Sequence, residues 1–325
     1  MKRSLHILLL VLMVSFNACA QKNKAYVGYY HGSGDHLLLM KDNAYYIVAY
    51  ATIIWGSWKV EKDHMGRDLI VLRPKNPEYF FDLYGRYNPN IKAGYKVKFN
   101  GFEKKETFIG MANTDTMQRV FNIDPNCFNH PYIHLFSEKP TTISLVDAVL
   151  ENSFEKQYSP RDTYTFSLGR NNDFIAVYHN PKDYHEEMHL FIEKKTKKIE
   201  LNGSSHGFKN LPMDKKLKKE INEIIQFAAK FKNTKTLYCN PSYNDFEDSS
   251  INIEKDYSFN EAKNAYISKY NYEKDEDIYP QKKEDAYHSR GVLFKYDKIT
   301  PSNITFKPFK INEKSLFTAK CDNEK

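Results

Sequence analysis

The closest match between residue spacing and a known chemistry in this chain is the sequence HEEMH, residues 185–189, which fits the pattern H-E-x-x-H. On a helix, this spacing places His185 and His189 on one face, where both imidazoles can bind Zn²⁺. Glu186 could then act as a general base on the metal-bound water. A zinc-dependent hydrolase is therefore one alternative for this protein.

The residues that follow the first histidine favour a strand instead of a helix. Met188, Leu190 and Ile192 alternate with other residues at period two, and the lysine-rich residues 194–198 are typical of a hairpin turn. On an extended chain the two histidines still share a face, but Glu186 points away from them, so the hydrolytic geometry is lost. We therefore favour neither a catalytic residue nor a cofactor, and zinc stays the alternative.

A second group of possible metal ligands is Cys127, His130 and His134. Such soft and borderline ligands can hold Zn or Cu, but His130 precedes a proline in a turn and His134 falls in an expected strand, so we favour a structural role. The mature chain keeps three cysteines, Cys127, Cys239 and Cys321. Either two of them form a disulfide and one thiol is left over, or all three thiols stay free.

The elements that must position these residues begin with a β meander near the N-terminus. Residues 35–40, 44–54, 58–61 and 69–72 are rich in apolar and aromatic residues, and 41–43 (KDN) is a turn signal between the first two strands. Antiparallel strands joined by tight turns must pair or cover their edges, so we expect a meander or a small barrel.

Three short sequences in this stretch, residues 28–30 (GYY), 37–39 (LLL) and 56–58 (GSW), give it a spacing that resembles the small lipocalin-like modules of Gram-negative envelope lipoproteins. The resemblance implies a β barrel or half-barrel, and it carries over no binding residue. The aromatic residues of the module are the first candidates for ligand contacts, although about half of them should be core. These candidates are Tyr45, Tyr46, Tyr50, Trp55 and Trp58.

The rest of the chain is predicted to be mainly β, with two or three helices packed on a second β-rich region, giving a β-rich α+β fold. The helices are expected at residues 144–154, 212–231 and 259–270, of which the second has the clearest apolar stripe. Residues 271–289 are charged and lack apolar periodicity, which indicates a loop or linker. The expected domains are an export signal (1–20), an N-terminal β module (24–75), a β-rich region (76–210) and a helix-containing C-terminal region (211–325), which can form one domain with the preceding region.

The N-terminus indicates export from the cytoplasm. A basic start is followed by an apolar run, residues 7–16, that is too short to span a bilayer. Two cleavage sites compete: a lipobox-like sequence in which Cys19 becomes lipidated, and a cut before Gln21. We expect the mature protein in the periplasm or at the outer membrane through a lipid anchor, or secreted.

The charge argues against a nucleic-acid partner. Removing two basic residues with the signal lowers the net charge from +7 to +5, from 48 − 2 = 46 basic against 41 acidic side chains, and both signs are interspersed. The leading hypothesis is a non-enzymatic envelope lipoprotein with a binding or structural role. Its small-molecule, glycan or protein partner is not specified by the sequence.

Overall fold

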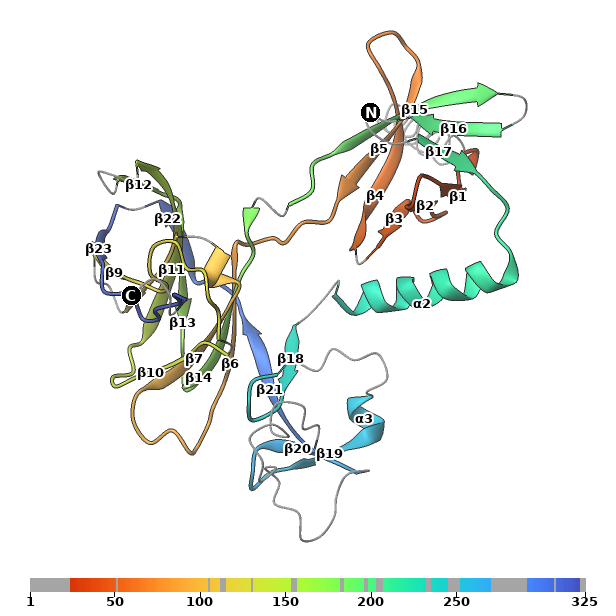
Figure 1. The fold of residues 1–325 in the computed structure, drawn as a ribbon. Helices are drawn as coiled ribbons and strands as arrows, with labels where there is room; N and C mark the ends of the chain where they lie inside the picture. Colours follow the sequence, from red (N-terminus) through yellow and green to blue (C-terminus); the bar gives the residue numbers. More distant parts are fainter. Residues whose placement is uncertain are drawn as a thin grey trace, which may run out of the picture. The chain divides into compact units, whose positions relative to one another are not determined.

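The structure is a computed structural model that describes residues 24–50, 52–104, 106–111, 115–129, 131–152, 157–181, 184–195, 198–202, 207–231, 235–244, 252–269, 291–306 and 308–321. The chain divides into two compact units, each assembled from separate stretches of sequence (Figure 1). The barrel unit comprises Met1–Pro77 and Tyr184–Lys232, and the sandwich unit comprises Glu78–Asp183 and Asn233–Lys325. The export signal and Cys19 lie outside the described residues.

The barrel unit closes eight antiparallel strands into a barrel in the order β1-β17-β16-β15-β5-β4-β3-β2. The strands are β1 (Gly28–His31), β2 (His36–Leu39), β3 (Ala44–Ala49), β4 (Thr52–Lys62), β5 (Asp68–Pro74), β15 (Met188–Lys195), β16 (Lys198–Asn202) and β17 (Gly207–Asn210). Neighbours in sequence are neighbours in the barrel, except that the first part of the sandwich unit is inserted between β5 and β15. The closing pair joins Tyr30 to Asn210 and His31 to Lys209.

Turn residues explain why the first strands form hairpins. Asn43 takes the left-handed conformation between β2 and β3 (φ 63°), and the Asp42 side chain accepts a hydrogen bond from the amide of Ala44. Between β4 and β5, Asp63 Oδ1 accepts from the amides of Met65 and Arg67, and Gly66 supplies a positive φ. The turn at 41–43 and the strand expected at 35–40 are as predicted, whereas the single strand expected at 44–54 is wrong, because it is divided between β3 and the start of β4, which pair antiparallel from Ala49 and Thr52.

The helix α2 (Lys215–Phe231) packs on the outside of the barrel. Asp214 caps it by accepting a hydrogen bond from the amide of Leu217 at 2.8 Å. Leu217, Ile221 and Ile225 contact an outward-facing cluster on β1 to β4. The helix predicted at 212–231 is therefore confirmed, and its lysine-rich face is exposed as expected from its amphipathic pattern. No helix in the described part of the chain is long and apolar enough to cross a membrane.

The sandwich unit packs two sheets face to face around one aromatic core. The first sheet has the order β10 (Ile133–Phe136), β7 (Tyr95–Asn100), β14 (Asp173–Tyr178), β6 (Phe81–Arg86), β21 (Val292–Ile299), β20 (Ala265–Ser268) and β19 (Tyr257–Asn260), with β18 (Thr236–Cys239) also paired to β21. The second has the order β22 (Asn303–Phe306), β13 (Asp162–Ser167), β11 (Thr142–Asn152), β8 (Glu106–Met111), β9 (Thr116–Arg119) and β23 (Lys310–Asn312), with β12 (Gln157–Pro160) also paired to β11. A short 3-10 turn, η1 (Phe102–Lys104), and the one-turn helix α3 (Ile253–Asp256) complete the unit.

The helix expected at 144–154 is wrong, because this segment lies in the strand β11. Leu145 faces the aromatic core of the sandwich, whereas Val146 and Ala148 are buried in a second cluster on the other face. A strand that is buried on both faces loses the alternation that identifies it in sequence. The Ser144 hydroxyl, at the start of the expected helix, lies 3.0 Å from the Thr165 hydroxyl on the neighbouring strand.

The helix expected at 259–270 is also wrong, because a hairpin of β19 and β20 occupies most of this segment. Its turn is held by Asn260, whose side chain accepts from the amide of Lys263, and by Asn264 in a left-handed conformation (φ 47°). The linker expected at 271–289 lies outside the described residues.

The β-rich fold with few helices is as predicted, but the structure divides the chain differently from the continuous segments 24–75, 76–210 and 211–325. The N-terminal strands alone do not close, because three strands from beyond residue 184 complete the barrel. The main helix consequently packs on the barrel and not on the second β-rich region.

Candidate functional site

The barrel contains a cavity of about 950 Å³ that opens widely to solvent. This volume lies within the range of small-molecule binding sites, about 300–1,000 Å³. The apolar side chains on its wall come from β3, β4, β5, β15 and β17, strands separated by more than a hundred residues of sequence. They are Ile47, Ala49, Ile54, Leu72, Met188, Leu190, Ile192 and Phe208.

The position of the cavity follows from where the large side chains are. An eight-stranded barrel has an interior that side chains can just fill, or that can hold one small ligand. Tyr30, Tyr45 and Trp58 fill part of the interior, and the Trp58 indole donates to the carbonyl of Met40 at 3.1 Å. The wall of the cavity instead carries mostly aliphatic residues, several of which pack against this core.

The polar residues along the cavity carry mainly negative charge. Asp35, Asp68, Glu186, Glu187 and Glu193 line it together with a single arginine, Arg67. All six are exposed or half-buried, so they lie where the cavity meets solvent. The cavity therefore combines an apolar wall with an acidic rim.

The five aromatic candidates from the sequence are not brought together. Tyr45 and Trp58 face the barrel interior, whereas Tyr46 and Trp55 belong to the outer cluster under α2. Tyr50 is 97% exposed. None of the five is among the residues that line the cavity. Tyr45 and Trp58 are core residues beside it, and the other three serve the outer surface.

The hydroxyl of Tyr45 is a polar atom inside the barrel without a hydrogen-bond partner among the described residues. Its ring is fully buried, and burial raises the pKa of the Tyr45 hydroxyl. By contrast, the neighbouring interior hydroxyl of Tyr30 donates to the carbonyl of Tyr26 at 2.7 Å. A buried hydroxyl without a hydrogen-bond partner lowers the stability of the fold, so we expect the Tyr45 hydroxyl to destabilise the barrel.

The HEEMH sequence lies at the rim of this cavity and is not helical. Residues 184–187 have no regular secondary structure and lead into the strand β15, which begins at Met188, so this part of the chain follows the strand alternative from Met188 onward. His189 contacts Glu187, with Nε2 and Oε1 2.8 Å apart, and Glu187 accepts from Arg73 at 2.5 Å. Hydrogen bonds from Arg73 and His189 lower the pKa of the Glu187 carboxyl. The carboxylate that meets the imidazole is thus Glu187, and the helical geometry that a zinc hydrolase needs from Glu186 is absent.

The second group of possible ligands is also accounted for. Cys127 forms a disulfide with Cys321, so its thiolate is not available to a metal, and Cys239 is a buried free thiol. His134 packs edge-on against Phe136, with ring centroids 4.5 Å apart, and burial lowers its pKa. His130 lies outside the described residues. Across the residues that the structure describes, no group of three or more histidine, cysteine or acidic side chains is arranged to hold a metal ion.

The cavity wall was missed by the sequence analysis because its members on β15 and β17 lie far along the chain from the N-terminal strands. The alternation of Met188, Leu190 and Ile192 was the available signal, since it indicates a strand with one apolar face.

Comparison of the chain with protein-family models, with curated proteins and with solved structures finds no match. Any function must therefore be argued from the geometry of this chain.

Proposed function

We propose that this protein is a non-enzymatic binding protein whose barrel unit holds one apolar small molecule. The observation that carries the proposal is the 950 Å³ cavity with its wall of aliphatic residues. Burial of apolar surface is the main favourable term in such binding, and a preformed wall avoids the cost of ordering the site. The pairing of β1 with β17 supports a preformed wall, because a closed barrel has no free edge.

The acidic rim indicates which apolar molecules are accepted. Five carboxylates and one arginine line the cavity; of the carboxylates, Asp68 pairs with Lys62 at 3.0 Å and Glu187 with Arg73 at 2.5 Å. A ligand with an anionic head would meet like charges at the mouth. We therefore expect a neutral or cationic amphiphile in preference to a fatty acid anion.

A titration with N-phenyl-1-naphthylamine, a neutral probe that fluoresces in apolar surroundings, tests the proposal. The wild-type protein should bind it saturably at one site. Ala49→Phe places a ring in the cavity and should weaken binding by at least about tenfold, because the ring occupies space that the probe needs. Ser57→Phe adds the same ring at an exposed position on β4 and should leave binding unchanged. Equal effects of the two variants would contradict the proposal that the probe binds in the cavity.

The charge preference has its own matched pair of probes. 8-Anilinonaphthalene-1-sulfonate has the same aromatic skeleton as the neutral probe with one added sulfonate, so the ratio of the two affinities measures the effect of the charge. We expect the neutral probe to bind more tightly, and Glu186→Gln to reduce the ratio severalfold. An anionic probe that binds more tightly in the wild type would contradict the acidic-rim argument.

The location is proposed together with the function. The basic start, short apolar run and Cys19 support a lipoprotein of the cell envelope, held at the membrane by its lipid. Labelling cells with radioactive palmitate should mark the wild type and not Cys19→Ala. A wild type without label would exclude the anchor and leave a periplasmic or secreted protein.

The non-enzymatic part of the proposal can be tested by metal analysis. Purified wild type and His185→Ala should contain equally little zinc, because the chain around residue 185 is not helical and so lacks the spacing that places two imidazoles and Glu186 around one ion. Stoichiometric zinc that is lost in His185→Ala would revive the hydrolase alternative.

A further inference from the structure

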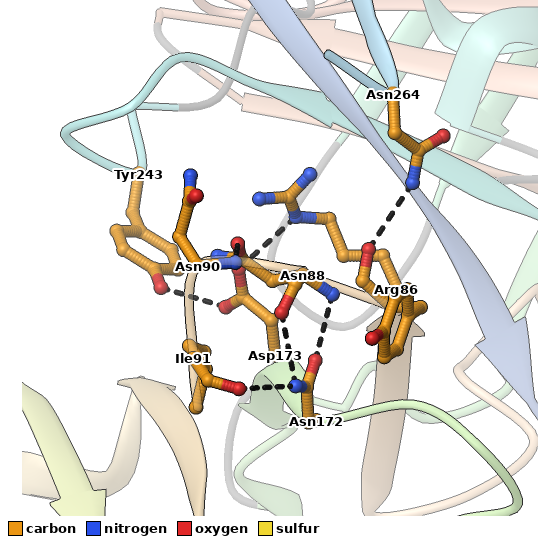
Figure 2. Close-up of polar contacts among 9 residues, drawn as sticks. Arg86, Asn88, Asn90, Ile91, Asn172, Asp173, Tyr243 and Asn264 are labelled. Atoms are coloured by element: carbon orange, nitrogen blue, oxygen red, sulfur yellow. Dashed lines mark hydrogen bonds and ion pairs between the residues drawn. The ribbon is translucent and has the colours of Figure 1, made fainter. Parts of the chain in front are cut away.

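The sandwich unit contains a small polar pocket that is separate from the barrel cavity and from every residue discussed as a ligand or catalyst above. Its volume is about 240 Å³, and it lies beside the end of β6, next to Arg86. Figure 2 shows the polar contacts that surround this arginine. The pocket would admit a small molecule but not a lipid.

Arg86 is buried, with 7% of its surface exposed, but only part of its guanidinium is used. Nε donates to Asp173 Oδ2 at 3.0 Å, and the guanidinium carbon lies 3.8 Å from the centre of the Phe294 ring. Among the described residues, no acceptor takes a hydrogen bond from the two terminal nitrogens, Nη1 and Nη2. Figure 2 shows them directed away from the Asp173 contact.

The two terminal nitrogens face the pocket. Neither nitrogen is among the buried side-chain atoms that lack a hydrogen-bond partner in the described part of the chain. Arg86 is itself one of the pocket's lining residues. A buried arginine at the wall of a cavity, with two donors that no described residue engages, is a suitable contact for an acceptor with two oxygens.

The surrounding network holds the guanidinium in place before any ligand arrives. Asp173 accepts three hydrogen bonds, from Arg86, from Asn88 Nδ2 at 2.8 Å and from the Tyr243 hydroxyl at 2.6 Å. Tyr243 has a left-handed backbone (φ 61°), which is unusual for a bulky residue and orients its ring toward Asp173. Asn172 fixes the chain at residue 88 by accepting from the Asn88 amide and donating to its carbonyl.

The lining of the pocket favours an organic anion. Arg86 and Lys263 both line it, whereas none of the lining residues is acidic. Asn88 and Asn90 add amide groups on one side, and Val292 and Phe294 add an apolar wall on the other. Positive charge, a flat two-donor edge and apolar surface together match a carboxylate attached to a small carbon skeleton.

We propose that the pocket beside Arg86 is a binding site for a small organic carboxylate, held by a two-pronged contact to the arginine and by the charge of Lys263. A phosphate ion matches less well, because Asp173 offsets one positive charge at the site and the apolar wall gives an inorganic ion no contact. The site is independent of the barrel cavity, since every residue that forms it belongs to the sandwich unit.

Calorimetric titration of the whole protein with sodium acetate, sodium benzoate and sodium phosphate, at constant ionic strength, tests the proposal. We expect saturable binding of benzoate, weaker binding of acetate because it lacks the ring that contacts the apolar wall, and no saturable binding of phosphate. The ¹⁵N signals of the arginine side chains should shift for one residue, assigned as Arg86 by its absence from Arg86→Lys.

Three variants separate the site from general charge effects. Arg86→Lys keeps the charge opposite Asp173 but loses the flat edge, and it should weaken benzoate at least about tenfold. Lys263→Gln, at an exposed position, should weaken it severalfold without affecting the fold, whereas Lys314→Gln, on another exposed surface of the same unit, should have no effect. If Arg86→Lys unfolds, Lys263→Gln decides alone. No saturable binding of either carboxylate, equal binding by Lys263→Gln and wild type, or a preference for phosphate would overturn the proposal.

Discussion

The two units use the same kind of sequence, aromatic-rich antiparallel strands, to build interiors of opposite character. The barrel interior is apolar, and a cavity of about 950 Å³ leads from it to solvent. The sandwich interior is filled with rings, such as Phe81, Phe99 and Phe102, whose centroids lie 5.1 to 5.6 Å apart in contacting pairs. Two facing sheets can approach until their side chains interdigitate, whereas the radius of a closed barrel is set by its strand number.

Polar groups are also divided between the units. Every buried polar or charged residue among those that the structure describes lies in the sandwich unit, including Arg86, Arg119, Asp147 and Asp173. The barrel keeps its charges at the rim. The two ligands that we propose follow this division, with an apolar ligand in the barrel and a polar one in the sandwich.

The largest expected effect compares leucines in the two interiors. Leu145→Ala, in the filled core of the sandwich, should lower the free energy of unfolding by about 3–5 kcal/mol, because it leaves a new cavity. Leu190→Ala, beside an existing cavity, should cost only about 2–3 kcal/mol, because Leu190 is buried but the space that its side chain leaves adds to a cavity already present.

Urea unfolding can report the two units separately. Both tryptophans of the chain, Trp55 and Trp58, lie on β4, so tryptophan fluorescence follows the barrel, while near-ultraviolet circular dichroism of the tyrosines also follows the sandwich. Equal losses in the two leucine variants would mean that the barrel is as tightly packed as the sandwich.

The next effect concerns the disulfide between Cys127 and Cys321, which joins distant parts of the sandwich unit. Replacing both cysteines by serine should destabilise this unit by about 2–4 kcal/mol and leave the tryptophan-detected transition unchanged. Dithiothreitol should lower the wild type to the level of the variant without affecting the variant. A shift of the tryptophan signal would show that the units do not unfold independently.

A pH dependence should distinguish the sandwich through Asp82. Burial alone would raise the pKa of the Asp82 carboxyl, but contacts to His179 at 3.1 Å and Lys298 at 2.8 Å outweigh it and lower that pKa. A lowered pKa contributes stability above the ordinary aspartate value, about 3.9, and this contribution is lost as pH falls through the folded-state value.

Asp82→Asn should therefore cost about 1–2 kcal/mol at pH 7, with the difference from wild type closing below about pH 4. Stability curves of both proteins from pH 7 to pH 3 measure it. A difference that stays constant over that range would mean that the charge of Asp82 is not the cause.

The smallest expected effect compares two tyrosine variants inside the barrel, whose changes in stability should differ in sign. Tyr45→Phe removes a buried hydroxyl that has no partner among the described residues, so the variant should be unchanged or more stable by up to about 1 kcal/mol. Tyr30→Phe removes a hydroxyl that donates to Tyr26 and should lose about 1 kcal/mol. Equal losses in the two variants would indicate that Tyr45 has a partner, such as an ordered water, in solution.

Local signals in the sequence predicted the parts of the fold that depend on local physics. Turn residues such as Asn43 marked the early hairpins, and the apolar stripe through Ile221 marked α2. The closure of the barrel could not be predicted, because β15 to β17 pair with strands more than a hundred residues away. The strand β11 was mistaken for a helix because both of its faces are buried.

The candidate sites were less predictable than the fold. The cavity depends on how far side chains such as Ala49 and Leu190 reach across a closed barrel, and periodicity carries no information on that distance. The pocket beside Arg86 joins this residue to Asp173 and Lys263, which share no motif and no fixed spacing. The HEEMH motif, which the sequence did offer, lies on a segment that is not helical, so the helical spacing that its chemistry needs is missing.

A crystal structure of the mature protein soaked with N-phenyl-1-naphthylamine tests the central claim most directly. We predict electron density for one probe molecule in the barrel cavity, in contact with Ile47, Leu72 and Leu190. A barrel interior filled by side chains, or a probe bound only outside the barrel, would contradict it.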